Sequence, residues 1–210
     1  MAKRRKVGNL LALHVLTTLY QRPMHPYEIA AEMRGHGKEQ DLKIQWGSLY
    51  TVVGNLEKHG FIEAAGTTRE GRRPERTVYS ITEAGRAEAV DWVRDLVGEP
   101  EREYPKLRAA LSVLGVLPPD EAVGLLRERA EILTRRIADE EAAIASYAET
   151  VPRLFTVEVE FGLALLRAEA DWVRGLVTEI EQGTLSGVEL WRAGHERLAS
   201  GPSQDGRREQ

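Results

Sequence analysis

The sequence predicts a mainly α-helical protein, with a small front domain that contains one β-hairpin and a rear domain of long helices. Apolar residues recur at helical spacing through most of the 210 residues, which is the main sequence signal for amphipathic helices. One short segment ending at residue 81 instead alternates apolar and polar residues, as a half-buried strand does. Beyond residue 118 the helical pattern continues through about four heptads, which is typical of helices that pair with other helices.

Composition excludes several classes of protein. The chain has no cysteine, so it offers neither disulfides nor thiolate metal ligands nor a thiol nucleophile. Its 42% hydrophobic content supports a core. No stretch approaches the roughly 20 apolar residues of a membrane span, and the basic start meets only a short amphipathic run, unlike a signal peptide. We therefore expect a cytoplasmic globular protein without a membrane partner.

Charge divides the chain more sharply than its net value of −4 suggests. Residues 1–80 hold 13 Lys/Arg against 8 Asp/Glu, a net of +5, and residues 81–210 hold 16 against 25, a net of −9. A basic part next to an acidic part predicts that the front meets a polyanion, with chance clustering on two solvated surfaces as the alternative. The terminal run Lys3–Lys6 is either an arm that reaches along a phosphate backbone or a solubilising tail.

Two short helices are predicted to open the front domain. Residues 9–22 repeat leucine and valine at a spacing of about four, and Pro23 ends the pattern. A second helix opens at His25-Pro26, with proline at its first position, where the missing N–H costs nothing. Tyr27 follows in the first turn, and the glycines of residues 35–37 break the helix.

The segment from Trp46 to Gly60 predicts the helix around which the front domain is organised. Its apolar residues fall at i, i+3, i+4 and i+7, which is one helical face, and Gly60 ends it. These apolar residues are Leu49, Val52, Val53 and Leu56. The opposite face carries Ser48, Tyr50, Thr51, Gly54, Asn55 and Lys58. Short hydrogen-bonding groups and a cation, with no carboxylate among them, suit a polyanion, although an ordinary solvated face has the same pattern.

A β-hairpin is predicted to follow this helix. Its strands are residues 61–64 and 76–81, and residues 65–75 form a long connection rich in glycine, threonine and arginine. The arginines are Arg69, Arg72 and Arg73 in the connection and Arg76 at its base. Long arginines on such a tip neutralise phosphates or enter a minor groove without reading sequence. A solvated charged loop is the alternative.

These elements together predict a winged helix-turn-helix, in which the hairpin is the wing. In that arrangement the last helix enters the major groove, and the N-terminus of the helix before it abuts the DNA backbone. Tyr27 is thereby placed to reach a phosphate, with a partly buried core aromatic as the alternative. The predicted DNA-binding residues are Tyr27, Ser48, Tyr50, Thr51, Asn55, Lys58, Arg69, Arg72, Arg73 and Arg76.

A fourth helix is predicted to close the front domain. Thr82 is a suitable N-cap, and Glu83 lies in the first turn. The predicted apolar face consists of Ala87, Val90, Val93 and Val97, with Trp92 beside it. Gly98 and Pro100 end the helix, so the DNA-binding domain is predicted to span residues 1–98.

The rear domain, predicted over residues 99–198, is a set of helices. A short helix is expected over residues 104–117, a helix of about 28 residues over 120–147, and another long helix over 153–182. The last of these carries a stripe of Val157, Phe161, Leu165, Ala168, Trp172, Leu176 and Ile180. A weaker helix is expected over 184–198.

Two long amphipathic helices need a partner for their apolar stripes, because a domain of this size cannot bury them unaided. The sequence therefore predicts a homodimer through the C-terminal helices, with a self-contained helical hairpin in a monomer as the alternative. A dimer also holds two DNA-reading modules about one helical turn apart, roughly 34 Å. The tail, residues 199–210, is expected to be disordered.

The ordered set of motifs resembles the PadR family of bacterial transcriptional regulators. The set is His25-Pro26-Tyr27-Glu28-Ile29, Gly47-Ser48-Leu49-Tyr50, Leu56-Glu57-Lys58-His59-Gly60-Phe61-Ile62, the arginine-rich hairpin, Val78-Tyr79-Ser80-Ile81-Thr82-Glu83-Ala84-Gly85, and a tryptophan-bearing helix. The resemblance covers about residues 8 to 97 closely and the remainder loosely. It implies a homodimeric, usually repressing protein that leaves its double-stranded operator DNA when an effector, often a small aromatic molecule, binds. The chain departs from the family at Gly54-Asn55, which shifts expected binding toward the wing.

No motif indicates catalysis or a cofactor. The five histidines lack metal-ligand spacing, and no glycine-rich phosphate loop or activated serine is present. We predict no enzyme, no cofactor and no metal site. An effector pocket is predicted near the junction of the fourth helix with the dimer helices, walled by Trp92 and Trp172, although tryptophans in such places are also ordinary core residues. A protein-interaction adaptor without DNA binding is the competing function.

Overall fold

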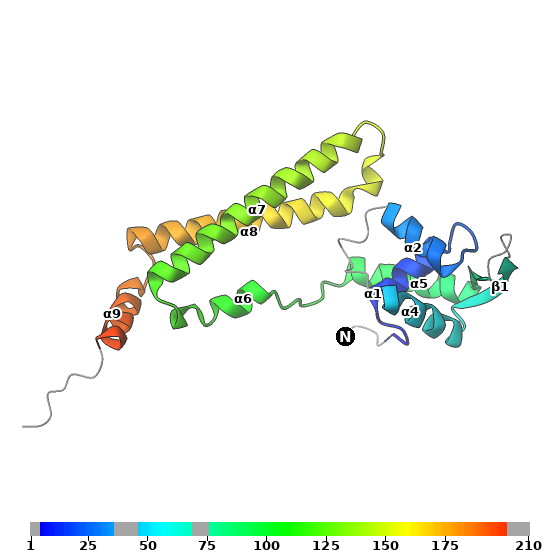
Figure 1. The fold of residues 1–210 in the computed structure, drawn as a ribbon, viewed down its shortest axis with the longest axis horizontal. Helices are drawn as coiled ribbons and strands as arrows, with labels where there is room; N and C mark the ends of the chain where they lie inside the picture. Colours follow the sequence, from blue (N-terminus) through cyan, green and yellow to red (C-terminus); the bar gives the residue numbers. More distant parts are fainter. Residues whose placement is uncertain (1–4, 36–45, 69–75, 201–210) are drawn as a thin grey trace, which may run out of the picture. The chain divides into compact units, whose positions relative to one another are not determined.

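The computed structural model describes residues 5–35, 46–68 and 76–200, and it divides the chain into two compact units (Figure 1). Unit 1 is Met1–Glu103 and unit 2 is Tyr104–Gln210. The division falls a few residues after residue 98, where the sequence places a domain boundary. No helix in the described ranges is long and apolar enough to cross a bilayer.

Unit 1 is a helical module with one small sheet. Its described elements are α1 (Leu10–Thr18), α2 (Pro26–Gly35), α4 (Trp46–Lys58), β1 (Ile62–Thr68), β2 (Arg76–Ile81) and α5 (Glu83–Gly98). The side chain of Asn9 caps α1 by accepting a hydrogen bond from Leu11 N at 2.9 Å. The helix ends at Thr18, short of the predicted end at residue 22. Beyond it the chain forms turns, in which Tyr20 N donates to Thr17 O at 3.2 Å and Gln21 N donates to Thr18 O at 3.4 Å.

The core of unit 1 forms around α1, which contacts α2, α4 and α5. The predicted inward residues of the helix over Trp46–Gly60 are buried, which confirms that face of α4. At the start of α5, Gly85 lies against the chain just before β1. A Cβ at this glycine would lie 2.0 Å from Phe61 O, so only glycine fits there.

The hairpin is longer than predicted. β1 and β2 pair antiparallel from Ile62↔Ile81 to Thr68↔Arg76, with a bulge between Ala64 and Gly66. Residues 65–68, expected in the connection, therefore belong to β1, because the bulge realigns the strand and pairing continues beyond it. A short bridge joins the sheet to the chain before α2: Met24 N donates to Tyr79 O at 3.0 Å, and Tyr79 N donates to Met24 O at 2.9 Å.

The buried face of α5 differs from the predicted one. Thr82 caps the helix as expected, since its Oγ1 accepts from Gly85 N at 3.0 Å. The buried residues are Gly85, Ala89 and Trp92, whereas Ala87, Val90, Val93 and Val97 are exposed. Because the small Gly85 and Ala89 let the helix backbone approach its neighbours closely, the face that contains Trp92 packs inward and the valine face does not.

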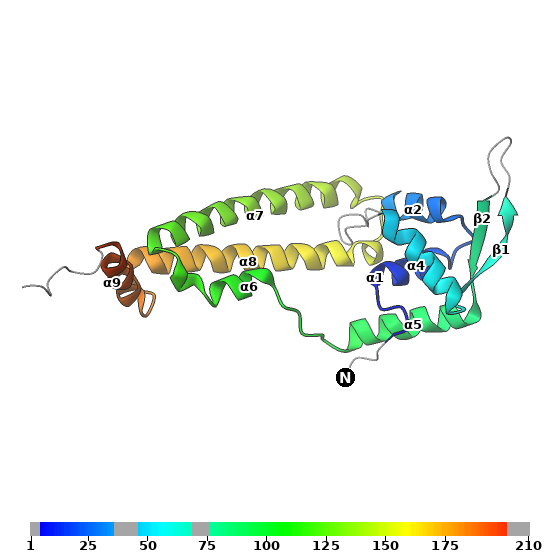
Figure 2. The same cartoon turned by 60° about the horizontal axis from the view of Figure 1, so that its bottom comes forward.

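Unit 2 is built on a long helical hairpin. Its elements are α6 (Lys106–Leu111), the 3-10 turn η1 (Leu114–Val116), α7 (Pro119–Tyr147), the 3-10 turn η2 (Arg153–Phe155), α8 (Val157–Gln182) and α9 (Val188–Ala199). Both views show α7 and α8 side by side and antiparallel (Figure 2). The prediction of a single helix over 104–117 is wrong, because the segment forms α6 and η1. Neither element has a buried residue, so core packing does not stabilise a longer helix here.

The predicted stripe of α8 is mostly exposed. Leu163, Ala170, Val173, Val177 and Ile180 are the buried residues of α8. Of the predicted stripe only Ile180 is buried and Leu176 half-buried, whereas Phe161, Leu165 and Trp172 are 66%, 55% and 52% exposed. The helix thus has two apolar faces, and the one with smaller side chains packs against α7.

Candidate nucleic-acid interface

The polar face of α4 is open to solvent. Leu49, Val52, Val53 and Leu56 anchor the other side of the helix in the core of unit 1. Tyr50, Thr51, Gly54, Asn55 and Lys58 are exposed, and Ser48 is half-buried. Lys58 lies in the last turn, where a cation complements the helix dipole. The unit therefore presents hydroxyl, amide and ammonium groups together on one accessible helix.

Hydrogen bonds fix the end of α4. Gly60 has φ +72°, the left-handed conformation that favours glycine. Gly60 N donates to Glu57 O at 2.9 Å, and Phe61 N donates to Leu56 O at 2.9 Å. This pair of bonds is a Schellman motif, and it directs the chain from α4 straight into β1. The helix and the wing are consequently joined by a rigid turn.

Tyr27 lies in the first turn of α2 and is exposed. Its side chain is 61% exposed, so the core alternative for this residue is wrong. His25 caps the helix, because its Nδ1 accepts from Tyr27 N at 3.1 Å. Glu28 accepts from His25 N at 2.8 Å, and this backbone hydrogen bond, with help from Arg22, lowers the pKa of Glu28. The cap holds the tyrosine at the helix N-terminus.

The predicted wing arginines lie at the edge of what the structure describes. Arg69, Arg72 and Arg73 fall outside the described residues. Arg76 begins β2 and pairs with Thr68, so the backbone of the wing is placed up to both ends of its tip. The structure thus forms a hairpin at this position, and its tip lies outside the described residues.

Arg5 has a structural role that the sequence does not reveal. Its side chain is 5% exposed, and it donates to Glu88 at 2.7 Å. It also pairs with Asp95 and, at 3.5 Å, with Asp91, while its guanidinium lies 5.2 Å from the Trp92 ring centroid. Burial alone would lower the pKa of Arg5, but the bond to Glu88 and the three carboxylates raise it. Arg5 therefore fastens the chain to α5 and is not a phosphate contact.

A carboxylate at the edge of α4 is a second feature absent from the sequence interpretation. Glu57 lies one residue before Lys58 and is exposed. The Tyr79 hydroxyl donates to Glu57 Oε2 at 3.4 Å, which joins β2 to α4. Burial, the charge of Glu57 and this bond raise the pKa of Tyr79. The signal was present in the sequence, because Glu57 interrupts an otherwise acid-free helix.

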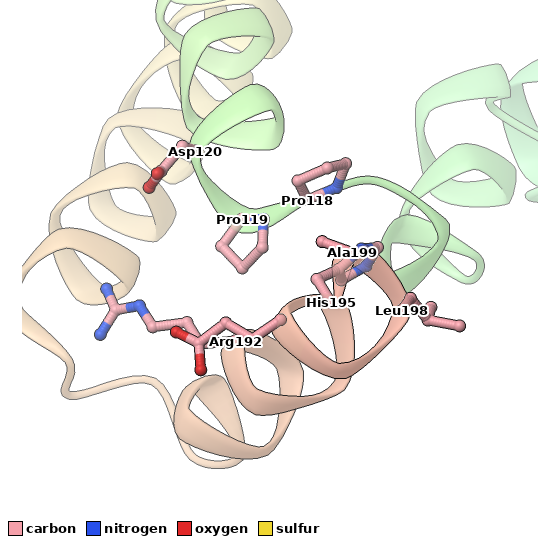
Figure 3. A pocket seen from close by; sticks show the side chains of 8 residues that line it. Pro118, Pro119, Asp120, Arg192, His195, Leu198 and Ala199 are labelled. Carbon is pink, nitrogen blue, oxygen red and sulfur yellow. The ribbon is translucent and has the colours of Figure 1, made fainter. Parts of the chain in front are cut away.

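The two predicted effector residues lie in different units. Trp92 is in the core of unit 1, under Arg5, and Trp172 is half-exposed on α8. A cavity of about 570 Å³ lies elsewhere in unit 2, between the start of α7 and α9 (Figure 3). Pro119, Arg192 and His195 are among its lining residues, and neither tryptophan is. His195 Nε2 lies 2.9 Å from Gly115 O, and Arg192 donates to Ile180 O at 2.9 Å.

Comparison with protein families finds a match in the front of the chain. Residues 15–91 match the family described as "Transcriptional regulator PadR-like family". The match begins within α1 and ends within α5, and it includes α2, α4, β1 and β2. A comparison with curated proteins finds no match.

Several solved structures share the fold of both units. Bacillus subtilis PadR in complex with operator DNA has a TM-score of 0.66 at 18% identity, with 80% of this chain and 98% of that chain covered. The same protein in complex with p-coumaric acid gives 0.68 at 16% identity, with coverage of 82% and 99%. The Vibrio cholerae virulence activator AphA gives 0.61 at 20% identity, with coverage of 82% and 98%. These likenesses confirm the mainly α fold with a hairpin wing and long C-terminal helices.

Proposed function

We propose that this chain is a cytoplasmic, DNA-binding transcriptional regulator that works as a homodimer, because residues 15–91 match the transcriptional regulator PadR-like family. The observation that carries the proposal is the exposed, polar face of α4, backed by a fully buried apolar face. A helix held in this way can enter a major groove without unfolding any part of its own domain. The related fold of Bacillus subtilis PadR has been solved in complex with operator DNA.

The residues of α4 divide between base edges and phosphates. Ser48, Thr51 and Asn55 carry short donors and acceptors, which suit base edges in the major groove. Lys58 supplies a positive charge for a phosphate, and Tyr50 flanks the face with a further hydroxyl. Gly54 leaves room for close approach of the DNA.

Phosphate contacts outside α4 orient the module on the duplex. The exposed hydroxyl of Tyr27, at the N-terminus of α2, is suited to a backbone phosphate. The wing arginines, Arg69, Arg72, Arg73 and Arg76, supply charge that neutralises phosphates without reading the sequence. This division places sequence reading on α4 and much of the affinity on the wing.

The exposed stripe of α8 supports the homodimer. Phe161, Leu165 and Trp172 lie at helical spacing on this face, and Leu125 and Ile132 of α7 are also largely exposed. Apolar side chains in a contiguous exposed stripe mark an interaction surface, and a second copy brings an identical stripe. Leu165→Asp should therefore shift the protein toward monomer in sedimentation experiments. Leu190→Asp, on the exposed face of α9, is the control that should leave the dimer intact.

Repression and its release by a small aromatic effector follow from the family resemblance. One related fold is described with p-coumaric acid, and another is described as an activator. We propose repression here, with Trp172, the half-exposed tryptophan of α8, at the effector site; Trp92 packs under Arg5 in the core of unit 1 and is not part of it. Titration with p-coumaric acid should quench tryptophan fluorescence, and Trp172→Phe should reduce the quenching more than Trp191→Phe. Absence of quenching at saturating ligand would refute this effector class.

The DNA-binding proposal is tested by salt dependence and charge reversal. Binding to a promoter fragment from the protein's own locus should weaken steeply as salt rises, because each neutralised phosphate releases counterions. Replacing Arg72 and Arg73 by Glu should abolish binding. The matched control is Arg207 and Arg208 replaced by Glu, an Arg-Arg pair that also follows a glycine, so the net charge changes equally. Equal loss in both variants would contradict a specific role for the wing.

The competing function is a winged-helix adaptor that binds another protein. Under that proposal the wing variant keeps its protein partner and the wild-type chain gives no salt-sensitive shift of promoter DNA. The polar α4 face favours the regulator, since the core of a protein-binding surface is usually richer in aromatic and other apolar groups.

A further inference from the structure

Glu57 is the one acidic residue in the sequence of α4, and it lies close to the helix face that is proposed to bind DNA. At about 100° per residue, Glu57 lies on the same flank as Tyr50, seven positions earlier, and next to the outward face that carries Lys58. A carboxylate at the rim of a DNA-facing surface repels phosphates. Its direction therefore matters for affinity.

Tyr79 determines that direction through three contacts. Its hydroxyl donates to Glu57 Oε2 at 3.4 Å, on the side of the helix that faces the wing strand β2. Its backbone is bonded in both directions to Met24, which is fully buried, so the residue is held in place between β2 and the approach to α2. Its ring packs against the core of unit 1. A single residue thus joins the wing, the α2 approach and the last turn of α4.

We infer that Tyr79 is a positioning residue for the DNA-facing surface, which turns the Glu57 carboxylate toward the wing strand and away from the phosphates. This inference rests on the proposed DNA-binding function. At 3.4 Å the bond is longer than the usual O–H···O distance of about 2.7–2.8 Å, so it adds little stability of its own. The backbone and core contacts of Tyr79 are what keep its hydroxyl beside the Glu57 carboxylate. The raised pKa of Tyr79 agrees with this placement, because burial and the Glu57 charge both oppose ionisation of the phenol.

A double-mutant cycle on the full-length protein tests the inference. Tyr79→Phe removes only the hydroxyl, so the freed carboxylate should weaken binding of the promoter fragment about three- to tenfold at low salt. Glu57→Gln alone should leave affinity unchanged or slightly raised. Adding Glu57→Gln to Tyr79→Phe should restore affinity to within about twofold of the Glu57→Gln protein, because the charge that caused the loss is gone.

Tyr20→Phe is the matched control. The Tyr20 hydroxyl donates to Arg86 O at 2.8 Å, so this change also removes one hydroxyl and one hydrogen bond from unit 1, without touching α4. It should leave DNA affinity unchanged. Glu57→Gln should alter affinity by the same factor in the Tyr20→Phe background as in the wild type. If Tyr79→Phe lowers affinity and Glu57→Gln fails to restore it, the role of Tyr79 is merely structural and the inference is wrong.

A DNA-free measurement separates this inference from the regulator proposal. In protein labelled with ¹³C in the tyrosine rings, NMR titration should show the pKa of Tyr79 falling when Glu57 is replaced by Gln. No change would show that the two groups are not in contact, which overturns the inference whatever the protein binds. If the wild type fails to bind DNA while this coupling is observed, the contact stands and the regulator proposal is what fails, together with the positioning role.

Discussion

The two units treat their apolar side chains differently. In unit 1 the largest apolar residues of α1, α4 and β1, such as Leu16, Leu56 and Ile62, have almost no exposed surface. In unit 2 the buried set is centred on valine and alanine, and the bulky Phe161 and Trp172 face solvent. Unit 1 therefore has a core of bulky residues, although the valine face of α5 is exposed, whereas unit 2 leaves bulky residues of α8 in water. This difference is expected when one unit reads a rigid ligand and the other binds a second copy.

The polar contacts of the two units differ in the same sense. Unit 1 has exposed ion pairs of Arg22 with Glu28 and Glu32, but it also holds the buried cation Arg5 among three carboxylates. The described ion pairs of the α7–α8 hairpin lie at the surface, among them Arg129–Glu169 at 2.6 Å and Arg167–Glu141 at 2.5 Å. Exposed pairs contribute about 0–1 kcal/mol each, so the hairpin depends mainly on its narrow apolar seam. Matched substitutions in the two units test this contrast.

The largest expected difference comes from one substitution made in each unit. Leu56→Ala, at a fully buried position, should destabilise unit 1 by about 2–5 kcal/mol, through lost transfer energy and the cavity left behind. Leu165→Ala, on the exposed stripe, should change the stability of the isolated monomer by less than about 0.5 kcal/mol. Amide hydrogen exchange reports the opening of each unit separately and measures both effects. Similar losses at low protein concentration would contradict an open face on α8.

Glycine replacements should have opposite signs in the two units. Gly85→Ala introduces a Cβ 2.0 Å from Phe61 O and 2.9 Å from Ile81 Cγ1, so unit 1 should lose about 1–3 kcal/mol. Gly175→Ala, inside α8, meets no atom within 4 Å and should stabilise unit 2 by up to about 1 kcal/mol, because alanine is the better helix former. Thermal unfolding followed by circular dichroism should show the transition fall in the first variant and rise in the second.

The sequence predicts the buried face of a helix correctly where the helix has only one apolar face. Leu49, Val52, Val53 and Leu56 define the buried side of α4 without ambiguity, and the polar face follows from it. On α5 the same reasoning selected the wrong face, and on α8 it selected an apolar stripe that is mostly exposed in the single chain. Periodicity shows which residues share a face, but it does not show which of two apolar faces the chain itself covers. The selected stripe of α8 is the one left for another molecule.

Polar contacts between residues far apart in the sequence could not be predicted either, because a local pattern does not show which residues meet in the fold. Glu88, Asp91 and Asp95 lie at helical spacing beside Trp92, yet nothing local indicates that Arg5 is their partner. The contact of Tyr79 with Glu57 likewise requires the register of the hairpin, which pairs Tyr79 with Ala64. The roles of the wing-tip arginines, by contrast, stay predictions, since Arg69, Arg72 and Arg73 lie outside the described residues.

Helix caps provide a smaller matched pair. Thr82 caps α5 through its hydroxyl, so Thr82→Ala should cost unit 1 about 1 kcal/mol. Thr156 occupies the same position before α8 but makes no side-chain cap bond, so Thr156→Ala should cost only a few tenths of a kcal/mol. Chemical denaturation of the two variants measures the difference. Equal costs would show that the hydroxyl of Thr82 is not a cap in solution.

The smallest expected effect is on the free energy of unfolding at acid pH. It distinguishes two causes of a lowered carboxyl pKa. Glu28 in unit 1 is held mainly by a backbone N–H, whereas Glu160 in unit 2 is held mainly by the Arg153 side chain on the surface. Each folded-state pKa lies below the usual 4.5, so each group contributes stability above that value and loses it as pH falls through the lowered pKa. Glu28→Gln should therefore flatten the acid dependence of unit 1, and the change should persist in 1 M salt because its main bond joins no second charge. Glu160→Gln should act only at low salt, since exposed ion pairs are screened. Unfolding curves at acid pH, at low and at high salt, measure the two responses. A salt-sensitive response of Glu28→Gln would show that Arg22, and not the His25 backbone, is the main cause of the lowered pKa of Glu28.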